Sequence, residues 1–178
     1  ANQREDGYFG NRKNLDIRKG EQPSMNTDKP DRVVDLWPNM IMLYPLRSLY
    51  EATGDPRVLP FMTKYFRWQL ELPVNEFLPG SWQKYRGGDN LDAALWLYDR
   101  TGEAWLLELA ALLHAQTSDW IGELGGSGPP SQEFDFGHGV NRAMGLKEPA
   151  LWWRCSGDPA HLAAARRGWL RVMAEHGQ

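Results

Sequence analysis

Apolar residues recur at helical spacing in three pairs of segments along the chain. The first segments of the pairs span residues 38–53, 91–101 and 139–156. The second segments follow Asp55, Glu103 and Asp158. Such stripes are typical of helices that bury one face. No stretch alternates convincingly between apolar and polar residues, so the pattern predicts an all-α chain.

A glycine-centred motif joins the two segments of each pair. It reads LYEATGDP at 49–56, LYDRTGEA at 97–104 and WWRCSGDP at 152–159. A glycine just past a helix end can adopt the left-handed conformation that closes the helix. The aspartate and proline that follow in the first and third copies suit the start of the next helix. Each copy therefore predicts a helix, a tight turn and a second helix, with kinks at the internal prolines Pro45 and Pro149.

The connections between these hairpins are long, polar and rich in glycine, over residues 71–89 and 118–138. Loops of this length are uncommon and often functional. Because consecutive helices alternate in direction, the tight turns are expected at one end of the bundle and the long loops at the other. The loop end is therefore where a site is expected. Residues 1–31 lack helical periodicity and predict an irregular entry segment at that same end.

Repeated α-hairpins predict an α/α toroid or an α-solenoid. A closed toroid usually has about six hairpins, whereas residues 32–178 supply three. We therefore expect residues 1–178 to be part of one (α/α)6 catalytic domain, which packs against the remainder of the barrel or a second chain.

Composition narrows the possible functions of the 178-residue chain. It has a formal net charge of −3, which disfavours a nucleic-acid binder that relies on a basic surface. No apolar run approaches the length of a membrane span, so no membrane partner is expected. The single cysteine excludes an internal disulfide and a cysteine-based zinc site. Nine tryptophans are more than a core of this size requires.

The loop end gathers aromatic, amide, carboxylate and basic side chains, a mixture typical of a carbohydrate pocket. Aromatic rings stack on the C–H faces of sugars, and planar polar groups bond sugar hydroxyls. The substrate-binding candidates are His138, Asn141, Arg86, Asp89, Asn90, Trp82 and Glu133.

Four of these candidates also have a structural interpretation. Asp89 can be the N-cap of a helix that starts at Leu91, and Arg86 can brace a turn. Trp82 can anchor its loop, and Glu133 is by default a solvated carboxylate. A histidine at position 138 gains little as a structural element, which favours a role in the site.

Other residues are expected to be structural. Trp37 precedes Pro38 and suits a hydrophobic staple, although Trp37, Trp82 and Trp120 all fall near the loop end. The six tryptophans on predicted helices are assigned to the core. Cys155 has the features of a small buried residue and not those of a nucleophile.

Three segments resemble the DUF1680 group, which includes the β-L-arabinofuranosidases of glycoside hydrolase families 127 and 146. Residues 5–10 (EDGYFG) resemble the entry segment of the group. Residues 82–102 resemble its RGGEN…WLYNRTGD segment, and residues 138–150 resemble its HGVN…GLKEPA helix. The resemblance covers nearly the whole chain, in the same order.

The resemblance implies an (α/α)6 glycoside hydrolase that releases L-arabinofuranose or related sugars from plant-type glycans with retention. It also implies a cysteine nucleophile held by zinc and a glutamate acid/base. Cys155 does not match that cysteine, so the catalytic residues are expected outside this chain. No cofactor is expected in the chain itself, although zinc is expected if the full-length protein shares this mechanism. The isolated chain is expected to be inactive.

Two other functions remain open from the residues alone. One is another α/α-toroid carbohydrate enzyme, such as an unsaturated uronyl hydrolase or a polysaccharide lyase. The other is a non-enzymatic α-hairpin scaffold that binds a partner through its loop face.

Overall fold

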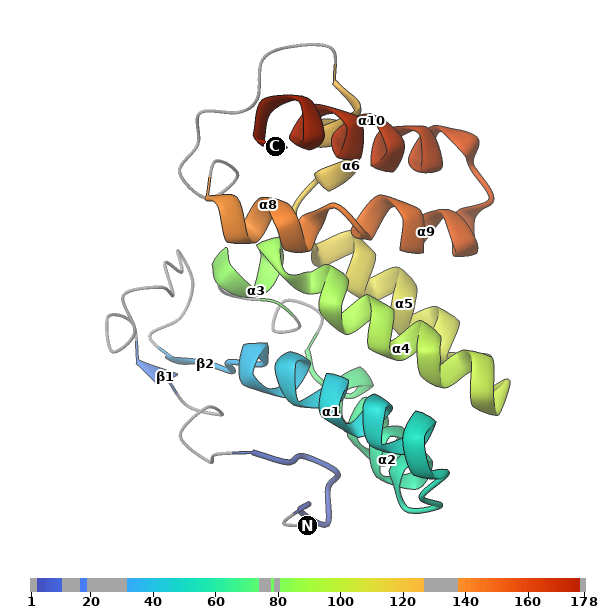
Figure 1. Ribbon diagram of the computed structural model, residues 1–178. Helices are drawn as coiled ribbons and strands as arrows, with labels where there is room; N and C mark the ends of the chain where they lie inside the picture. The colour runs from blue at the N-terminus through green and yellow to red at the C-terminus, as the bar shows by residue number, and fades with distance from the viewer. Residues whose placement is uncertain are drawn as a thin grey trace.

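The structure is a computed structural model that describes residues 3–10, 17–18, 32–73, 78, 81–126 and 138–176. This part of the chain is almost entirely helical, which confirms the predicted all-α class (Figure 1). The helices are α1 (Trp37–Thr53), α2 (Val58–Leu70), α3 (Ser81–Tyr85), α4 (Gly87–Thr101), α5 (Trp105–Gln116), α6 (Trp120–Gly125), α8 (Gly139–Gly145), α9 (Glu148–Ser156) and α10 (Pro159–His176). Strands β1 (Ile17–Arg18) and β2 (Arg32–Val33) form a short antiparallel ladder.

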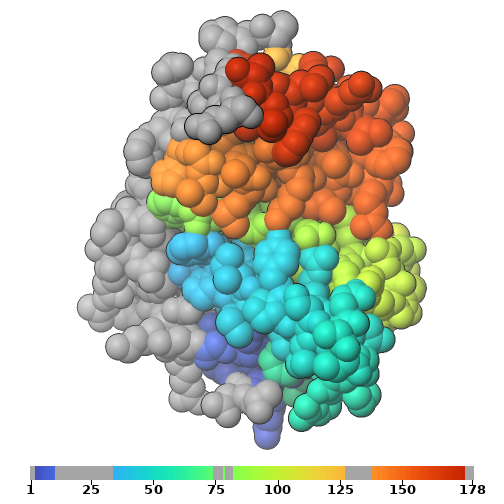
Figure 2. All heavy atoms as spheres, viewed as in Figure 1, coloured from blue at the N-terminus to red at the C-terminus, as the bar shows by residue number. Residues whose placement is uncertain are grey.

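The helices form the predicted hairpins and pack in two layers. Helices α1, α4 and α8–α9 lie side by side, with α2 and α5 behind them (Figure 1). Figure 2 shows the same face as spheres, with α1 and α2 packed below the orange and red residues of α8–α10. The core between α1, α2, α4 and α5 also receives Tyr8 and Phe9 from the entry segment.

The three predicted tight turns are confirmed. Gly54, Gly102 and Gly157 have φ values of 65°, 68° and 68°. Each donates its backbone N–H to the carbonyl four residues earlier, as expected for a left-handed helix cap. All three turns lie at one end of the bundle, on the right in Figure 1. The opposite end, where α3, α4 and α8 begin, is therefore the end at which a site was predicted.

Of the two aspartates predicted to start a helix, Asp158 does so, whereas Asp55 lies three residues before its helix. Asp158 immediately precedes α10, and its Oδ1 accepts the N–H of Ala160 at 2.8 Å. Asp55 accepts the N–H of Arg57 at 3.0 Å, but α2 begins only at Val58. Asp55 therefore organises the turn before the helix.

The predicted start of α4 at Leu91 is wrong, because the helix begins at Gly87. A Cβ on Gly87 would lie 2.1 Å from Thr117 Oγ1, and a Cβ on Gly88 would lie 3.2 Å from Glu148 Cβ. The two glycines thus let the first turn of α4 fit between its neighbours. Helix α6 likewise lies within the predicted loop 118–138, and the side chain of Asp119 caps it.

Residues 139–156 form two helices in place of the single kinked helix that was predicted. Helix α8 ends at Gly145 and α9 begins at Glu148. Pro149 has no N–H to donate to the Gly145 carbonyl, so the helical ladder is interrupted there. Helix α1, in contrast, continues past Pro45.

The assignment of all helical tryptophans to the core is wrong for two of them. Trp153 is 38% exposed and Trp169 is 56% exposed. Trp169 belongs to an apolar face of α10 that we call the α10 face, formed by Leu162, Trp169, Leu170 and Met173. Over the described residues, no helix combines the length and apolar character needed to cross a bilayer.

Candidate functional site

Four predicted site residues meet where α3, α4 and α8 begin. The guanidinium carbon of Arg86 lies 4.2 Å from the ring centroid of Trp82. Arg86 Nε donates to Asn141 Oδ1 at 3.0 Å. The ring of His138 meets Trp82 edge-on, with centroids 5.2 Å apart. Trp37 completes this group, which we call the arginine cluster, because its ring centroid lies 4.3 Å from the Arg86 guanidinium carbon.

The position of Trp37 differs from the predicted staple. Trp37 is the first residue of α1 and stacks with Trp82 at a centroid distance of 6.2 Å. Gln83 fixes the chain just before α1, since it accepts the N–H of Leu36 and donates to the Val34 carbonyl, both at 2.9 Å. Sequence reasoning missed Gln83, whose side-chain amide bonds to the backbone of Val34 and Leu36 as a neighbouring strand would.

His138 has a structural contact that the sequence did not indicate. It is the N-cap of α8, and its Nδ1 accepts the N–H of Val140 at 3.3 Å. Nδ1 is therefore an acceptor in this contact. The side chain remains half-buried beside Trp82. Capping and a role in the site are thus compatible for this residue.

Asp89 is buried in a second group, the lysine cluster, formed by Tyr44, Asp89 and Lys147. The Tyr44 hydroxyl donates to Asp89 Oδ1 at 2.9 Å, and Lys147 Nζ forms an ion pair with the same oxygen. Lys147 Nζ also donates to the Tyr44 hydroxyl oxygen. Burial and the neighbouring Asp89 carboxylate raise the pKa of Tyr44, so its hydroxyl stays protonated. Asp89 lies inside α4 and not at an N-cap.

Buried polar atoms without partners surround the start of α4. Both amide atoms of Asn90 lack a hydrogen-bond partner among the described residues, as do Asp89 Oδ2 and Glu148 Oε2. Glu148 Oε1 lies 2.6 Å from His114 Nδ1, and the His114 ring stacks on Trp152 at 4.0 Å. Buried polar groups are usually bonded, so unpaired ones mark places where a polar ligand or water fits.

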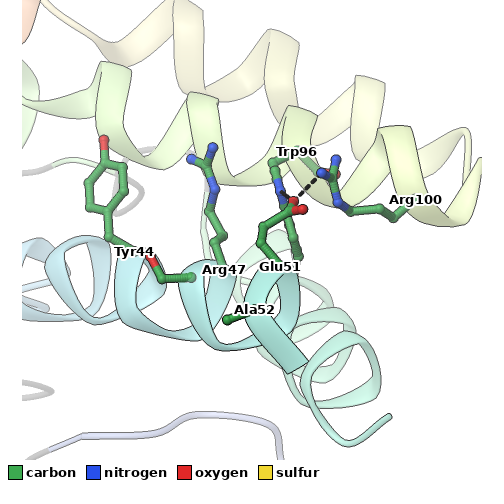
Figure 3. A pocket seen from close by; sticks show the side chains of 7 residues that line it. Tyr44, Arg47, Glu51, Ala52, Trp96 and Arg100 are labelled. Atoms are coloured by element: carbon green, nitrogen blue, oxygen red, sulfur yellow. Dashed lines mark hydrogen bonds and ion pairs between the residues drawn. The ribbon is translucent and has the colours of Figure 1, made fainter. Parts of the chain in front are cut away.

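A groove of about 640 Å³ separates α1 and α4 (Figure 3). Glu51 crosses it, accepting from Trp96 Nε1 at 2.7 Å and pairing with Arg100. The lining residues are Tyr44, Arg47, Ser48, Glu51, Ala52, Trp96 and Arg100. No predicted site residue lines the groove, but Tyr44 connects it to the lysine cluster.

The family model of the β-L-arabinofuranosidase GH127 catalytic domain matches residues 1–178. The chain belongs to this family. GH127 is a glycoside hydrolase family. The chain therefore belongs to an enzyme that acts on a carbohydrate. The comparisons with curated proteins and with solved structures found no match.

Trp120, which was assigned to the loop end, is not part of the arginine cluster. Trp120 is fully buried, and its Nε1 donates to the Tyr85 carbonyl at 3.0 Å. A Cβ on Gly145 would lie 2.2 Å from the Trp120 ring, so Trp120 packs directly against α8. Glu133 lies outside the described residues.

Sequence reasoning missed Tyr44, His114, Lys147 and Glu148. The last two had a signal, because they belong to the GLKEPA motif within residues 138–150. Tyr44 and His114 had none, since each sits on a helix face with ordinary spacing.

The described residues do not fit the zinc–cysteine centre that the resemblance implies for GH127. No group of three or more His, Cys, Asp or Glu side chains in the described ranges is arranged to hold a metal. Cys155 packs near Leu91 and Leu95, and burial raises the pKa of its thiol. A nucleophilic cysteine requires a lowered pKa, so Cys155 is not activated.

Proposed function

We infer that the chain forms part of the substrate-binding face of a β-L-arabinofuranosidase-like enzyme that acts on plant-type glycans. The observation that carries this proposal is the arginine cluster, at the end opposite the tight turns. Residues 1–178 would then be one portion of a single catalytic domain.

The chemistry of the arginine cluster suits a sugar. The ring of Trp82 is half-buried and offers an apolar surface for sugar C–H groups. Arg86 supplies N–H donors, and the imidazole of His138 supplies ring nitrogens that can bond a sugar hydroxyl. These groups bind and orient a substrate without performing the bond cleavage.

Glycoside hydrolysis also needs an acid and a nucleophile or base. The buried carboxylates Asp89 and Glu148 are held by Lys147 and His114 respectively. Asp89 is thereby committed to a structural ion pair. We therefore propose that the catalytic pair lies outside the described residues, and we derive no step through zinc.

Hydrolysis of an aryl β-L-arabinofuranoside by the full-length protein tests this function. His138→Asn removes the imidazole but keeps a side chain suited to the N-cap position. We expect kcat/KM to fall at least about tenfold, or roughly 1.4 kcal/mol of transition-state stabilisation, with an unchanged melting temperature. Val140→Ala, on an exposed position of the same helix, is the control.

Unchanged kcat/KM in the His138 variant would contradict the proposed role of His138. Absence of hydrolysis of any arabinofuranoside by the active full-length protein would contradict the proposed substrate. Hydrolysis measured with and without a chelator tests whether the full-length protein uses zinc. Activity that a chelator does not reduce would exclude a nucleophile held by zinc.

A further inference from the structure

Arg86 is a buried cation held in one orientation. Its side chain lies between Trp37 and Trp82, whose ring planes differ by 22°. The residue is 4% exposed, and Nε is fixed by Asn141. Three contacts from three helices therefore set where its planar fork points.

The terminal nitrogens of Arg86 have no acceptor within the described part of the chain. A guanidinium carries five N–H donors, and the contact with Asn141 uses one of them. Neither Nη atom is among the fully enclosed unpaired atoms, so both remain reachable from outside. Four N–H donors are thus available to a ligand.

Arg86 also lacks an ion-pair partner among the described residues. Arg142, the other buried arginine of this region, pairs with Glu123 at 3.0 Å, whereas Arg86 forms no such ion pair. The neighbouring carboxylate, Asp89, is committed to Lys147. Burial lowers the pKa of Arg86, and the nearby Asp89 carboxylate opposes this shift only in part.

We propose that Arg86 binds the carboxylate of a uronic acid unit, so that the substrate of this site is an acidic glycan. The planar fork of a guanidinium matches a carboxylate through two parallel N–H···O bonds. A carboxylate would also neutralise the unpaired buried charge, which hydroxyl groups of a neutral sugar do not. The proposal rests on the proposed glycoside hydrolase function and names its substrate class.

Binding of D-galacturonate and D-galactose to the full-length protein tests the proposal. The two sugars differ at the group that Arg86 would contact. Titration calorimetry, supported by the fluorescence of the flanking tryptophans, should give a Kd at least about tenfold lower for galacturonate. Arg86→Gln should abolish this preference, and Arg86→Lys should retain only part of it.

Arg100→Gln is the matched control. Arg100 also lies over an indole, 4.2 Å from the centroid of Trp96, but it is paired with Glu51 across the groove (Figure 3). Its replacement should leave the preference for galacturonate intact.

Equal affinity of wild-type protein for the two sugars would overturn the proposal, and this comparison does not depend on any variant folding. The proposal would also be overturned if folded Arg86→Gln kept the preference for galacturonate. The same holds if inorganic phosphate bound as tightly as galacturonate. Arabinofuranoside hydrolysis by the full-length protein reports separately on the proposed function, because it uses a neutral substrate.

Discussion

At the scale of the residue, the site is organised by buried charges and by how each is balanced. Asp89 is balanced by Lys147, while Arg86 has no bonded counter-ion in the described part of the chain. Ionised groups are costly to bury unless they are paired or bonded. The partner of each buried charge therefore matters for stability and for ligand binding. Asp35 is a third buried charge, with 3% of its surface exposed. Among its described contacts, its Oδ1 accepts one hydrogen bond, from the backbone N–H of Trp37.

Asp35 predicts a dependence of stability on pH. Burial raises the pKa of Asp35, with the Trp37 N–H opposing. A raised folded-state pKa means that the folded state binds the proton more tightly, so the group lowers stability as pH rises through that pKa. Asp35→Asn should therefore raise the melting temperature at pH 7 by about 2–4 °C, the shift that roughly 1 kcal/mol produces at this size.

The gain from Asp35→Asn should shrink as the pH is lowered from 7 toward 4, because protonation removes the buried charge of the wild-type carboxyl. Thermal unfolding followed by circular dichroism measures it. Glu108→Gln changes an exposed carboxylate on α5 and should show little effect at either pH. A gain that grows on acidification would contradict the assignment.

At the scale of the element, apolar periodicity and the glycine motif were sufficient to predict the hairpins. The helix starts were harder, because Gly87 and Gly88 have low helix propensity and read as a loop. Their lack of a Cβ lets the first turn of α4 pack against Thr117, just after α5, and against Glu148 of α9. Local sequence does not contain that information, since the neighbours come from other parts of the chain.

The conformation of the tight turns predicts that replacement by alanine destabilises the protein at one glycine, Gly157, and not at another, Gly139. Gly157 has φ 68° and open space around its Cβ position, so Gly157→Ala should cost about 1–2 kcal/mol through backbone strain alone. Gly139 also has open space but lies at the first position of α8 with an ordinary φ. Gly139→Ala should leave the free energy of unfolding unchanged or raise it slightly. Equal losses of unfolding free energy for the two variants, measured by urea unfolding, would contradict the explanation.

At the scale of the whole molecule, the sequence predicted the hairpin array. It also placed four of the candidate residues at the loop end, where they meet. Which side chains contact one another there did not follow from the sequence. Arg86, Asn141 and His138 were assigned to one end by their motifs, yet the contact of Lys147 with Tyr44 spans 103 residues. Such a contact is specified by the packing of α1, α4 and α9 and by no local pattern.

The α10 face predicts self-association of the isolated chain. Exposed apolar side chains that form a continuous patch promote association. The weight-average mass of the 20.4 kDa chain in sedimentation equilibrium should therefore rise with concentration. Leu170→Glu should reduce this rise, whereas Leu107→Glu, at an exposed apolar position on α5, should not. A concentration-independent monomer would contradict the prediction.

The distance in sequence between the members of the lysine cluster has a consequence for how the molecule folds. The hairpins α1–α2, α4–α5 and α9–α10 join helices through turns of a few residues, so their contacts close short loops and form early. Tyr44 and Asp89 are 45 residues apart, and Tyr44 and Lys147 are 103 apart. Their association must wait until preformed hairpins dock. The lysine cluster should therefore be among the last parts of the described structure to acquire its native contacts during refolding.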